Sequence, residues 1–397
     1  MAHSNLLTPL ALLVVVVAAA SCGDARSGAT EPSAAPARAP EAATAEAAAP
    51  EPAEGPDPSA PAQVVAIGGG IRAICVVVDD GRVRCVGDDV HESSPTTANV
   101  DLGVGDRRVV EVALLEWDLC ARRFDGGVVC RTSVEATNEP LAELGAAATS
   151  IEGGMNHACA LLSDRRVACW GHGQLGQLGD GRGKDSAAAV VVAGLDDAIA
   201  LALGWDHSCA LRSSGEVVCW GANELGQLGG PGGARRRPQA VPGIADATAI
   251  ASSMRSKQTC ALRRSGAVSC WGSWGMESEI RPARLGKGPI DLPPLADVVE
   301  VAVNTWMICG RQASGAVHCW DLAPEYAETS KGPVYGPPAP IFPGEAAIGL
   351  TSSAFAVHLL RADMTILIHG ELVRGREPLV RIDPLLALPV AAAPAGP

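Results

Sequence analysis

Twelve of the thirteen cysteines fall into pairs with a fixed spacing, which is typical of disulfides or of metal sites. The two members of a pair are always ten residues apart: Cys75 and Cys85, Cys120 and Cys130, Cys159 and Cys169, Cys209 and Cys219, Cys260 and Cys270, Cys309 and Cys319. There is no C-x-x-C, and pairs scattered along the chain cannot build one tetrahedral site. Paired strands around a short turn bring such cysteines within bonding range, so we predict six disulfides, with buried free thiols as the alternative.

The other candidate residues fit no catalytic or metal motif. Residues 171–176 match G-x-G-x-x-G, but they lead into more glycine rather than a helix, which indicates turns. His157 and His207 each stand two residues before a cysteine, where other repeats carry unrelated residues, so we expect hydrogen-bonded packing histidines. The sequence has no H-E-x-x-H and no nucleophile elbow. We therefore predict no catalytic residue, metal or cofactor, and a protein that is not an enzyme.

A repeat positions the cysteines. The first cysteines of successive pairs recur at intervals of 45, 39, 50, 51 and 49 residues, and one more step of 49 reaches His358, with Ile368 ten residues further on. Short apolar runs and turn residues alternate in each unit, which is typical of strands rather than helices. Seven units with room for four strands each predict an all-β fold, a seven-bladed β-propeller over residues 63–385.

Units three and four carry a family resemblance. Residues 152–161, 167–171 and 173–179 resemble the repeat of the regulator of chromosome condensation family, and the fourth unit repeats the pattern at residues 207–211, 219–223 and 226–229. The resemblance implies the same seven-bladed propeller. The chain is similar in architecture to secreted bacterial members such as β-lactamase inhibitory protein II, which binds another protein through its blade loops. Guanine nucleotide exchange, the best-known family activity, is a remote alternative.

The N-terminal 62 residues read as a targeting segment and a tether. Residues 6–20 are almost entirely apolar, and Ser21 and Cys22 follow them directly. The sequence Ala19, Ala20, Ser21 and Cys22 resembles a bacterial lipobox. We predict a signal peptide at residues 1–21, lipidation of Cys22 and a membrane anchor in the cell envelope, with ordinary secretion as the alternative. Residues 22–62, rich in Ala, Pro and Glu, predict a disordered tether, and residues 386–397 a disordered tail.

Net charge and cysteine content indicate which class of partner and which compartment to expect. A net charge of -13 makes nucleic acid a poor partner, because phosphate contacts would form against a repulsive field. Thirteen cysteines favour an oxidising compartment. We expect a monomeric, non-catalytic envelope lipoprotein that binds an envelope protein or glycan, with an envelope hydrolase or lyase on the same scaffold as the alternative.

Two more predictions concern the loops and the chain ends. Three residues before each first cysteine, where the chain enters a hairpin, the residue type varies while the core pattern persists, and this variation predicts a binding face. Its residues, with a neighbouring tryptophan, are Arg72, Trp117, Asn156, Trp205, Asp206, Lys257, Trp306 and Phe355. Residues 378–382 have the pattern of a strand that unit one lacks, so we expect them to join the first blade and close the ring.

Overall fold

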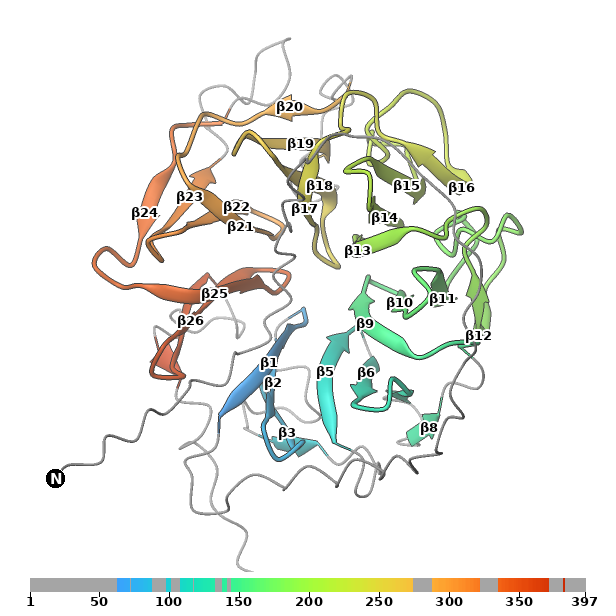
Figure 1. The fold of residues 1–397 in the computed structure, drawn as a ribbon, viewed down its shortest axis with the longest axis horizontal. Helices are drawn as coiled ribbons and strands as arrows, with labels where there is room; N and C mark the ends of the chain where they lie inside the picture. The colour runs from blue at the N-terminus through green and yellow to red at the C-terminus, as the bar shows by residue number, and fades with distance from the viewer. Residues whose placement is uncertain are drawn as a thin grey trace, which may run out of the picture.

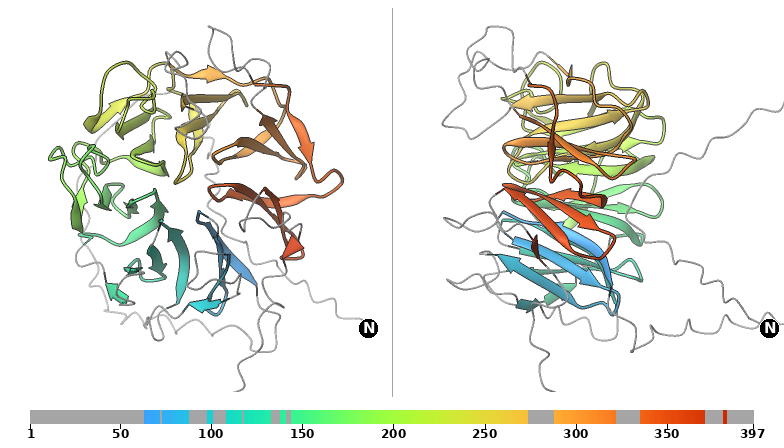
Figure 2. Two further views of the ribbon diagram at one scale, coloured as in Figure 1. Left: turned by 180° about the vertical axis from the view of Figure 1, so that it is seen from behind. Right: turned by 90° about the vertical axis from the view of Figure 1, so that its left-hand side faces the viewer.

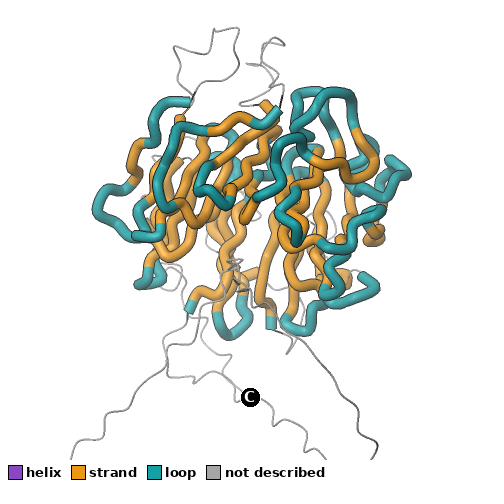
Figure 3. The backbone as a smooth tube through the Cα atoms, turned by 45° about the horizontal axis from the view of Figure 1, so that its top comes forward, coloured by secondary structure: helices purple, strands orange, loops and turns teal. Residues whose placement is uncertain are grey.

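The computed structural model describes residues 63–71, 73–87, 98–100, 108–116, 118–132, 138–140, 144–273, 288–321, 335–370 and 381–382. Within these ranges every regular element is a β-strand, and Figure 3 shows strands and loops alone. None of the described segments forms a helix that could cross a membrane. The predicted signal peptide, Cys22, the tether and the tail lie outside the described residues, as do Arg72 and Trp117 of the predicted binding face.

The described strands form seven four-stranded antiparallel sheets, arranged as blades around a central axis (Figures 1 and 2). Each blade takes four consecutive strands in spatial order, which we call A to D from the axis outward. The A strands of blades one to seven are β1 (Val64–Gly69), β5 (Val109–Leu114), β9 (Ala148–Gly153), β13 (Ala198–Leu203), β17 (Ala247–Ala251), β21 (Val298–Val303) and β25 (Ala347–Ser352). The B strands are β2 (Ala73–Val78), β6 (Asp118–Arg123), β10 (His157–Leu162), β14 (His207–Arg212), β18 (Lys257–Arg263), β22 (Met307–Gln312) and β26 (Ala356–Arg361).

The outer half of each blade completes the sheet. The C strands are β3 (Val83–Gly87), β7 (Val128–Thr132), β11 (Val167–Gly171), β15 (Val217–Gly221), β19 (Val268–Ser273), β23 (Val317–Asp321) and β27 (Ile366–Gly370). The D strands are β4 (Ala98–Val100), β8 (Asn138–Pro140), β12 (Ser186–Val191), β16 (Arg235–Ala240), β20 (Ile290–Asp291), β24 (Ala339–Ile341) and β28 (Arg381–Ile382). This architecture confirms the predicted all-β, seven-bladed propeller.

The B–C hairpin has the same backbone turn in every blade. The sixth residue after the first-cysteine position has a positive φ throughout, and it is glycine in five blades, as at Gly215 with φ of 91°. Arg165 and Met364 adopt the same conformation in blades three and seven, with φ of 64° and 62°. Glycine predominates here because it has no Cβ to clash in the left-handed region.

The six cysteine pairs form six disulfides, one across each B–C hairpin of blades one to six. The paired cysteines are directly opposed in the strand register, as for Cys209 and Cys219, and their Cα atoms lie 4.0–4.1 Å apart. In blade seven His358 opposes Ile368 at the same register position. The spacing of the repeat therefore predicts the pairing of strands B and C in all seven blades.

The disulfides of blades two to five each pack against a tryptophan of the following blade. Cys159 and Cys169 share one buried cluster with Trp220, and the disulfide of blade four shares another with Trp271. The indole N–H of Trp220 donates to the Gln177 carbonyl oxygen at 2.8 Å, which satisfies the polar end of a fully buried ring. Cystine and indole together fill the space between neighbouring blades.

The predicted closure of the ring is wrong. β28, which includes Arg381 and Ile382, pairs with β27 as the outer strand of blade seven, and blade one builds all four strands from its own segment. The Pro-containing strand β16 is likewise the outer strand of its own blade four rather than the start of blade five. Proline lacks an N–H, so it suits such an edge strand.

Packing between the first and last blades closes the ring instead. Val64 and Ile74 of blade one lie in one buried cluster with Leu360 and Ile368 of blade seven. The backbone N–H of Ala354 also donates to the Gly70 carbonyl oxygen at 2.8 Å. Similar backbone hydrogen bonds join the A–B loops of blades two and three, three and four, four and five, and six and seven. The A–B loops are therefore tied to one another around the axis.

Candidate binding face

The A–B loops carry the predicted binding residues to one end of the propeller, which we call the A–B face. The strands of a blade alternate in direction, so the B–C hairpins lie at the opposite end. Of the predicted residues, Asn156, Trp205, Asp206, Lys257, Trp306 and Phe355 are described and lie in these loops or at the first residue of strand B.

Arg255 brings three of these blades together. Its guanidinium carbon lies 5.2 Å from the centre of the Trp205 ring and 5.5 Å from that of Phe355, and the ammonium of Lys257 lies 4.9 Å from the Trp205 ring. Trp205 belongs to blade four, Arg255 and Lys257 to blade five, and Phe355 to blade seven. All four side chains are half-buried, and we call them the aromatic-cation cluster. Cations over aromatic faces at this distance attract the rings electrostatically.

A buried apolar layer supports the cluster from below. Met155, Met254 and Ala354 are almost completely buried, and Trp205 and Phe355 pack against the hydrophobic cluster that contains them. The Nε atom of Arg255 is enclosed and has no hydrogen-bond partner in the structure. The rings are therefore held by packing against this layer.

The remaining predicted residues lie outside this cluster. The Asp206 carboxylate accepts a long hydrogen bond of 3.4 Å from the Gln177 side-chain amide. Trp306 is 38% exposed, and its backbone N–H donates to the Asn304 side chain at 2.7 Å. Asn156 is half-buried, and its backbone carbonyl accepts from the N–H of His172 at 2.9 Å. The structure thus gathers Trp205, Lys257 and Phe355 of the predicted face around Arg255.

Arg255, the residue that joins the cluster, is not among the residues predicted from the sequence. Five residues before the first-cysteine position, blades one, three and four have Gly70, Gly154 and Gly204, and blades two, six and seven have Leu115, Asn304 and Ser353. Arg255 is the one charged residue at this position of the sequence. This departure from the repeat is the signal that would have identified Arg255.

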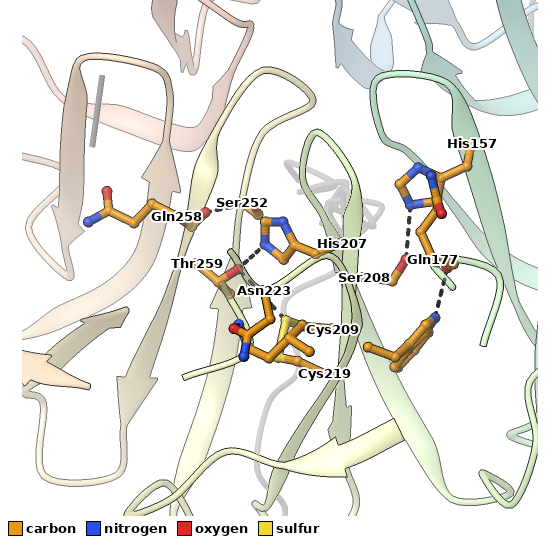
Figure 4. Close-up of a disulfide and its surroundings, with 12 residues drawn as sticks. His157, Gln177, His207, Ser208, Cys209, Cys219, Asn223, Ser252, Gln258 and Thr259 are labelled. Carbon is orange, nitrogen blue, oxygen red and sulfur yellow. Dashed lines mark hydrogen bonds between the residues drawn. A yellow bond between two sulfur atoms is a disulfide. The ribbon is translucent and has the colours of Figure 1, made fainter. Parts of the chain in front are cut away.

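The two candidate histidines are buried between blades. His157 Nε2 is 2.9 Å from the Ser208 hydroxyl, and His207 Nε2 is 2.8 Å from the Thr259 hydroxyl (Figure 4). Burial lowers the pKa of each imidazole to about 3, so both are neutral at pH 7. They hold neighbouring B strands together, as packing histidines do. In the described part of the chain no group of three or more His, Cys, Asp or Glu side chains could hold a metal ion.

Gly171 and Gly176, the ends of the glycine motif, have φ of 101° and 89°. A Cβ on Gly171 would lie 2.5 Å from the Asn156 carbonyl oxygen. The motif therefore serves a tight turn after strand β11 and not a helix that could bind a phosphate.

Comparison with known proteins identifies the repeat. The family model for the Regulator of chromosome condensation (RCC1) repeat matches residues 148–177 and 198–227, which begin at strand A of blades three and four. Among curated proteins no sequence matches the chain.

Solved structures show the same fold at low sequence identity. Human WBSCR16 is 15% identical with a TM-score of 0.61, and the alignment covers 73% of this chain and 84% of that one. Yeast RCC1 (Prp20), crystallised with Kap60, is 15% identical with a TM-score of 0.58, covering 72% and 75%. The ectodomain of the receptor kinase ACR4 from Arabidopsis thaliana is 17% identical with a TM-score of 0.51, covering 78% and 98%. The chain is a seven-bladed β-propeller of the regulator of chromosome condensation type, with the family's repeat matched directly in blades three and four.

Proposed function

We propose that the chain is a non-catalytic binding module of the cell envelope, anchored through a lipid on Cys22, that holds a partner protein on its A–B face. The aromatic-cation cluster carries this proposal. Trp, Phe and Arg are residue types that often dominate binding energy when they are partly buried and held in place by packing. Here loops from blades four, five and seven supply them at one end of the ring.

The chemistry of the cluster favours an acidic contact on the partner. Two cations, Arg255 and Lys257, lie over the Trp205 ring. A carboxylate of the partner would accept from the guanidinium, while its apolar neighbours pack on the aromatic rings. The same chemistry suits an acidic envelope glycan, which the experiment below separates from a protein.

The fold and the disulfides support the cellular setting. One neighbour in fold, yeast RCC1 (Prp20), is seen bound to another protein, Kap60, so a propeller of this type can serve as a protein scaffold. Six disulfides suit an oxidising environment outside the cytosol.

Capture from solubilised envelope with the mature chain as bait tests the proposal. We expect Arg255→Ala to reduce capture of a discrete protein at least about tenfold, since truncated hot-spot residues commonly cost 2 kcal/mol or more. Phe124→Ala is the matched control, because Phe124 is 81% exposed on the B–C hairpin of blade two, at the opposite end. It should leave capture unchanged.

Two outcomes would contradict the proposal. Equal capture by wild type and Arg255→Ala would remove the A–B face as the binding surface. Capture that survives protease treatment of the envelope but not glycosidase treatment would replace the protein partner with a glycan. Circular dichroism and thermal melting of each variant show whether the ring stays folded.

A further inference from the structure

A cavity of about 600 Å³ lies on the axis of the ring and is lined by the A strands of all seven blades. Its lining is mixed: aliphatic side chains such as Ile199, Leu203 and Val301 lie beside polar ones, which include several serines and threonines and three glutamates. A volume of this size is typical of small-molecule sites.

Two of the three glutamates in the wall are already neutralised. Glu111 pairs with Arg122 at 2.6 Å, and Glu300 pairs with Arg311 at 2.7 Å, each on the adjacent B strand. The Glu300 carboxylate also accepts the backbone N–H of Leu350 in the next blade at 3.1 Å. The Glu300 carboxylate therefore also joins blades six and seven.

Glu152 is the exception. It faces Cys159 across strands β9 and β10, and no hydrogen bond or ion pair to the described residues reaches its carboxylate. Its side chain is exposed to the cavity, and loss of hydration to the surrounding protein first and the charge of Glu111 second raise its pKa to about 8. The same register position in the other six blades is small or uncharged: Gly68, Ala113, Ala202, Ala251, Ala302 and Thr351.

We propose that the axial cavity binds a small aliphatic ammonium compound, whose ammonium group pairs with the Glu152 carboxylate while its hydrocarbon body lies against the aliphatic wall. A single carboxylate with no protein partner matches a single cationic head. The aliphatic part of the lining favours a hydrocarbon body, and one unpaired carboxylate gives too few oxygen ligands for a metal ion.

Binding is coupled to loss of one proton. In the empty cavity at pH 7 Glu152 carries a proton, and the incoming ammonium displaces it to solvent, so the complex contains one carboxylate and one ammonium. Glu111 and Arg122 of blade two are the charged pair facing Glu152 on one side, and strand β13 of blade four, on the other side, has no charged residue. The proton that is released on binding should therefore come from Glu152.

Calorimetry with n-octylammonium, and with 1-octanol as the uncharged match, tests this site on the full mature chain. We expect one ammonium bound per chain and an affinity that rises about tenfold per pH unit up to pH 8 and then levels off. At pH 7 buffers of different ionisation enthalpy should report close to one proton released. 1-Octanol should bind without proton release.

Two variants test whether the Glu152 carboxylate binds the ammonium group. Glu152→Gln keeps shape and neutrality, so it should fold normally, lose at least about tenfold in octylammonium affinity at pH 9 and keep 1-octanol binding. Glu152→Gln combined with Ala251→Glu moves the carboxylate to the equivalent position of blade five and should restore cation binding. Absence of octylammonium binding to wild type, or equal affinity of wild type and Glu152→Gln, would overturn the proposal. Partner capture on the A–B face is measured separately and is unaffected by either outcome.

Discussion

At the residue scale, three buried histidines and one glutamate on the cavity wall have strongly shifted pKa values. His157, His207 and His358 are completely buried, and burial lowers the pKa of each to about 3. His358 differs from the other two, because neither of its ring nitrogens has a hydrogen-bond partner in the structure. Glu152 shows the opposite shift, and its pKa rises to about 8. Both shifts disfavour the charged form, and they make stability depend on pH in opposite directions.

The stability of the fold should therefore pass through a maximum near pH 6.5. Between pH 3 and 6.5 the unfolded histidines bind protons that the folded ones cannot, so the free energy of unfolding rises with pH, by at most about 1.4 kcal/mol per unit for each histidine. Between pH 4.5 and 8 folded Glu152 retains a proton that the unfolded chain has lost, so this contribution falls as pH rises. Urea denaturation at pH 5, 6.5 and 8 measures both the rise in stability below pH 6.5 and the fall above it.

Glu152→Gln serves as the control for the fall in stability above pH 6.5. Because glutamine does not titrate, the variant should lose less stability than wild type between pH 6.5 and 8. Identical declines in the two proteins would show that another group causes the fall.

At the scale of elements, the blade is built around its B–C hairpin. The positive-φ residue turns the two strands in every blade, and a cystine ties them in blades one to six. In blades two to five a tryptophan from the following blade covers the cystine, as Trp271 covers Cys209 and Cys219. Blade seven keeps the hairpin and its register but replaces the cystine with His358 and Ile368. This leaves an imidazole without hydrogen bonds where the other blades have a covalent link, so blade seven should be the weakest element of the ring.

Installing the missing bridge should stabilise blade seven. His358→Cys with Ile368→Cys places two cysteines at directly opposed positions, as in the other six blades, and removes the unpartnered imidazole. We expect about 2 to 3 kcal/mol of added stability under oxidising conditions. Mass spectrometry of the non-reduced protein checks that the bridge forms, and thermal melting measures the gain. The matched variant with serine at both positions should not be stabilised, and a stabilised serine variant would contradict the role of the bridge.

The elements also show why some features follow from the sequence and others do not. The pairing of His358 with Ile368 follows from the period of the repeat, because register is a local property of a hairpin. The blade to which an outer strand belongs does not follow from the sequence. β16, for example, is polar and largely exposed, and no pattern assigns it to one blade rather than the next. The aromatic-cation cluster joins blades four, five and seven, and contacts between distant units leave no spacing in the sequence.

At the scale of the whole molecule, the ring is held by its junctions rather than by a strand shared between the chain ends. The junction of blades seven and one uses an apolar cluster that includes Val64, Ile74 and Ile368, together with the hydrogen bond from Ala354 to Gly70. Every junction thus uses the same kind of packing, and the ends of the chain have no special fastening among the described strands.

Mutations at the end junction should consequently cost as much as those at any other. We expect Ile368→Ala to lower the free energy of unfolding by about 2 to 5 kcal/mol, the range for large-to-small changes in a core. Leu201→Ala, between blades three and four, is the matched control and should cost a similar amount. Removing residues 383–397 should leave the melting temperature nearly unchanged. A sharp loss of stability on this truncation would mean that the chain end fastens the ring after all.

One blade corresponds to one uninterrupted stretch of chain, and this correspondence bears on how such a ring can evolve. Copying or losing a gene segment of 39 to 51 codons, the interval between repeats, adds or removes a complete sheet and leaves no neighbour half built. In a propeller whose two ends share a sheet, the same event at either end would leave an unpaired fragment. The cost of changing the number of blades here is confined to re-fitting the curvature of the ring, so this lineage can sample rings of different size through single recombination events.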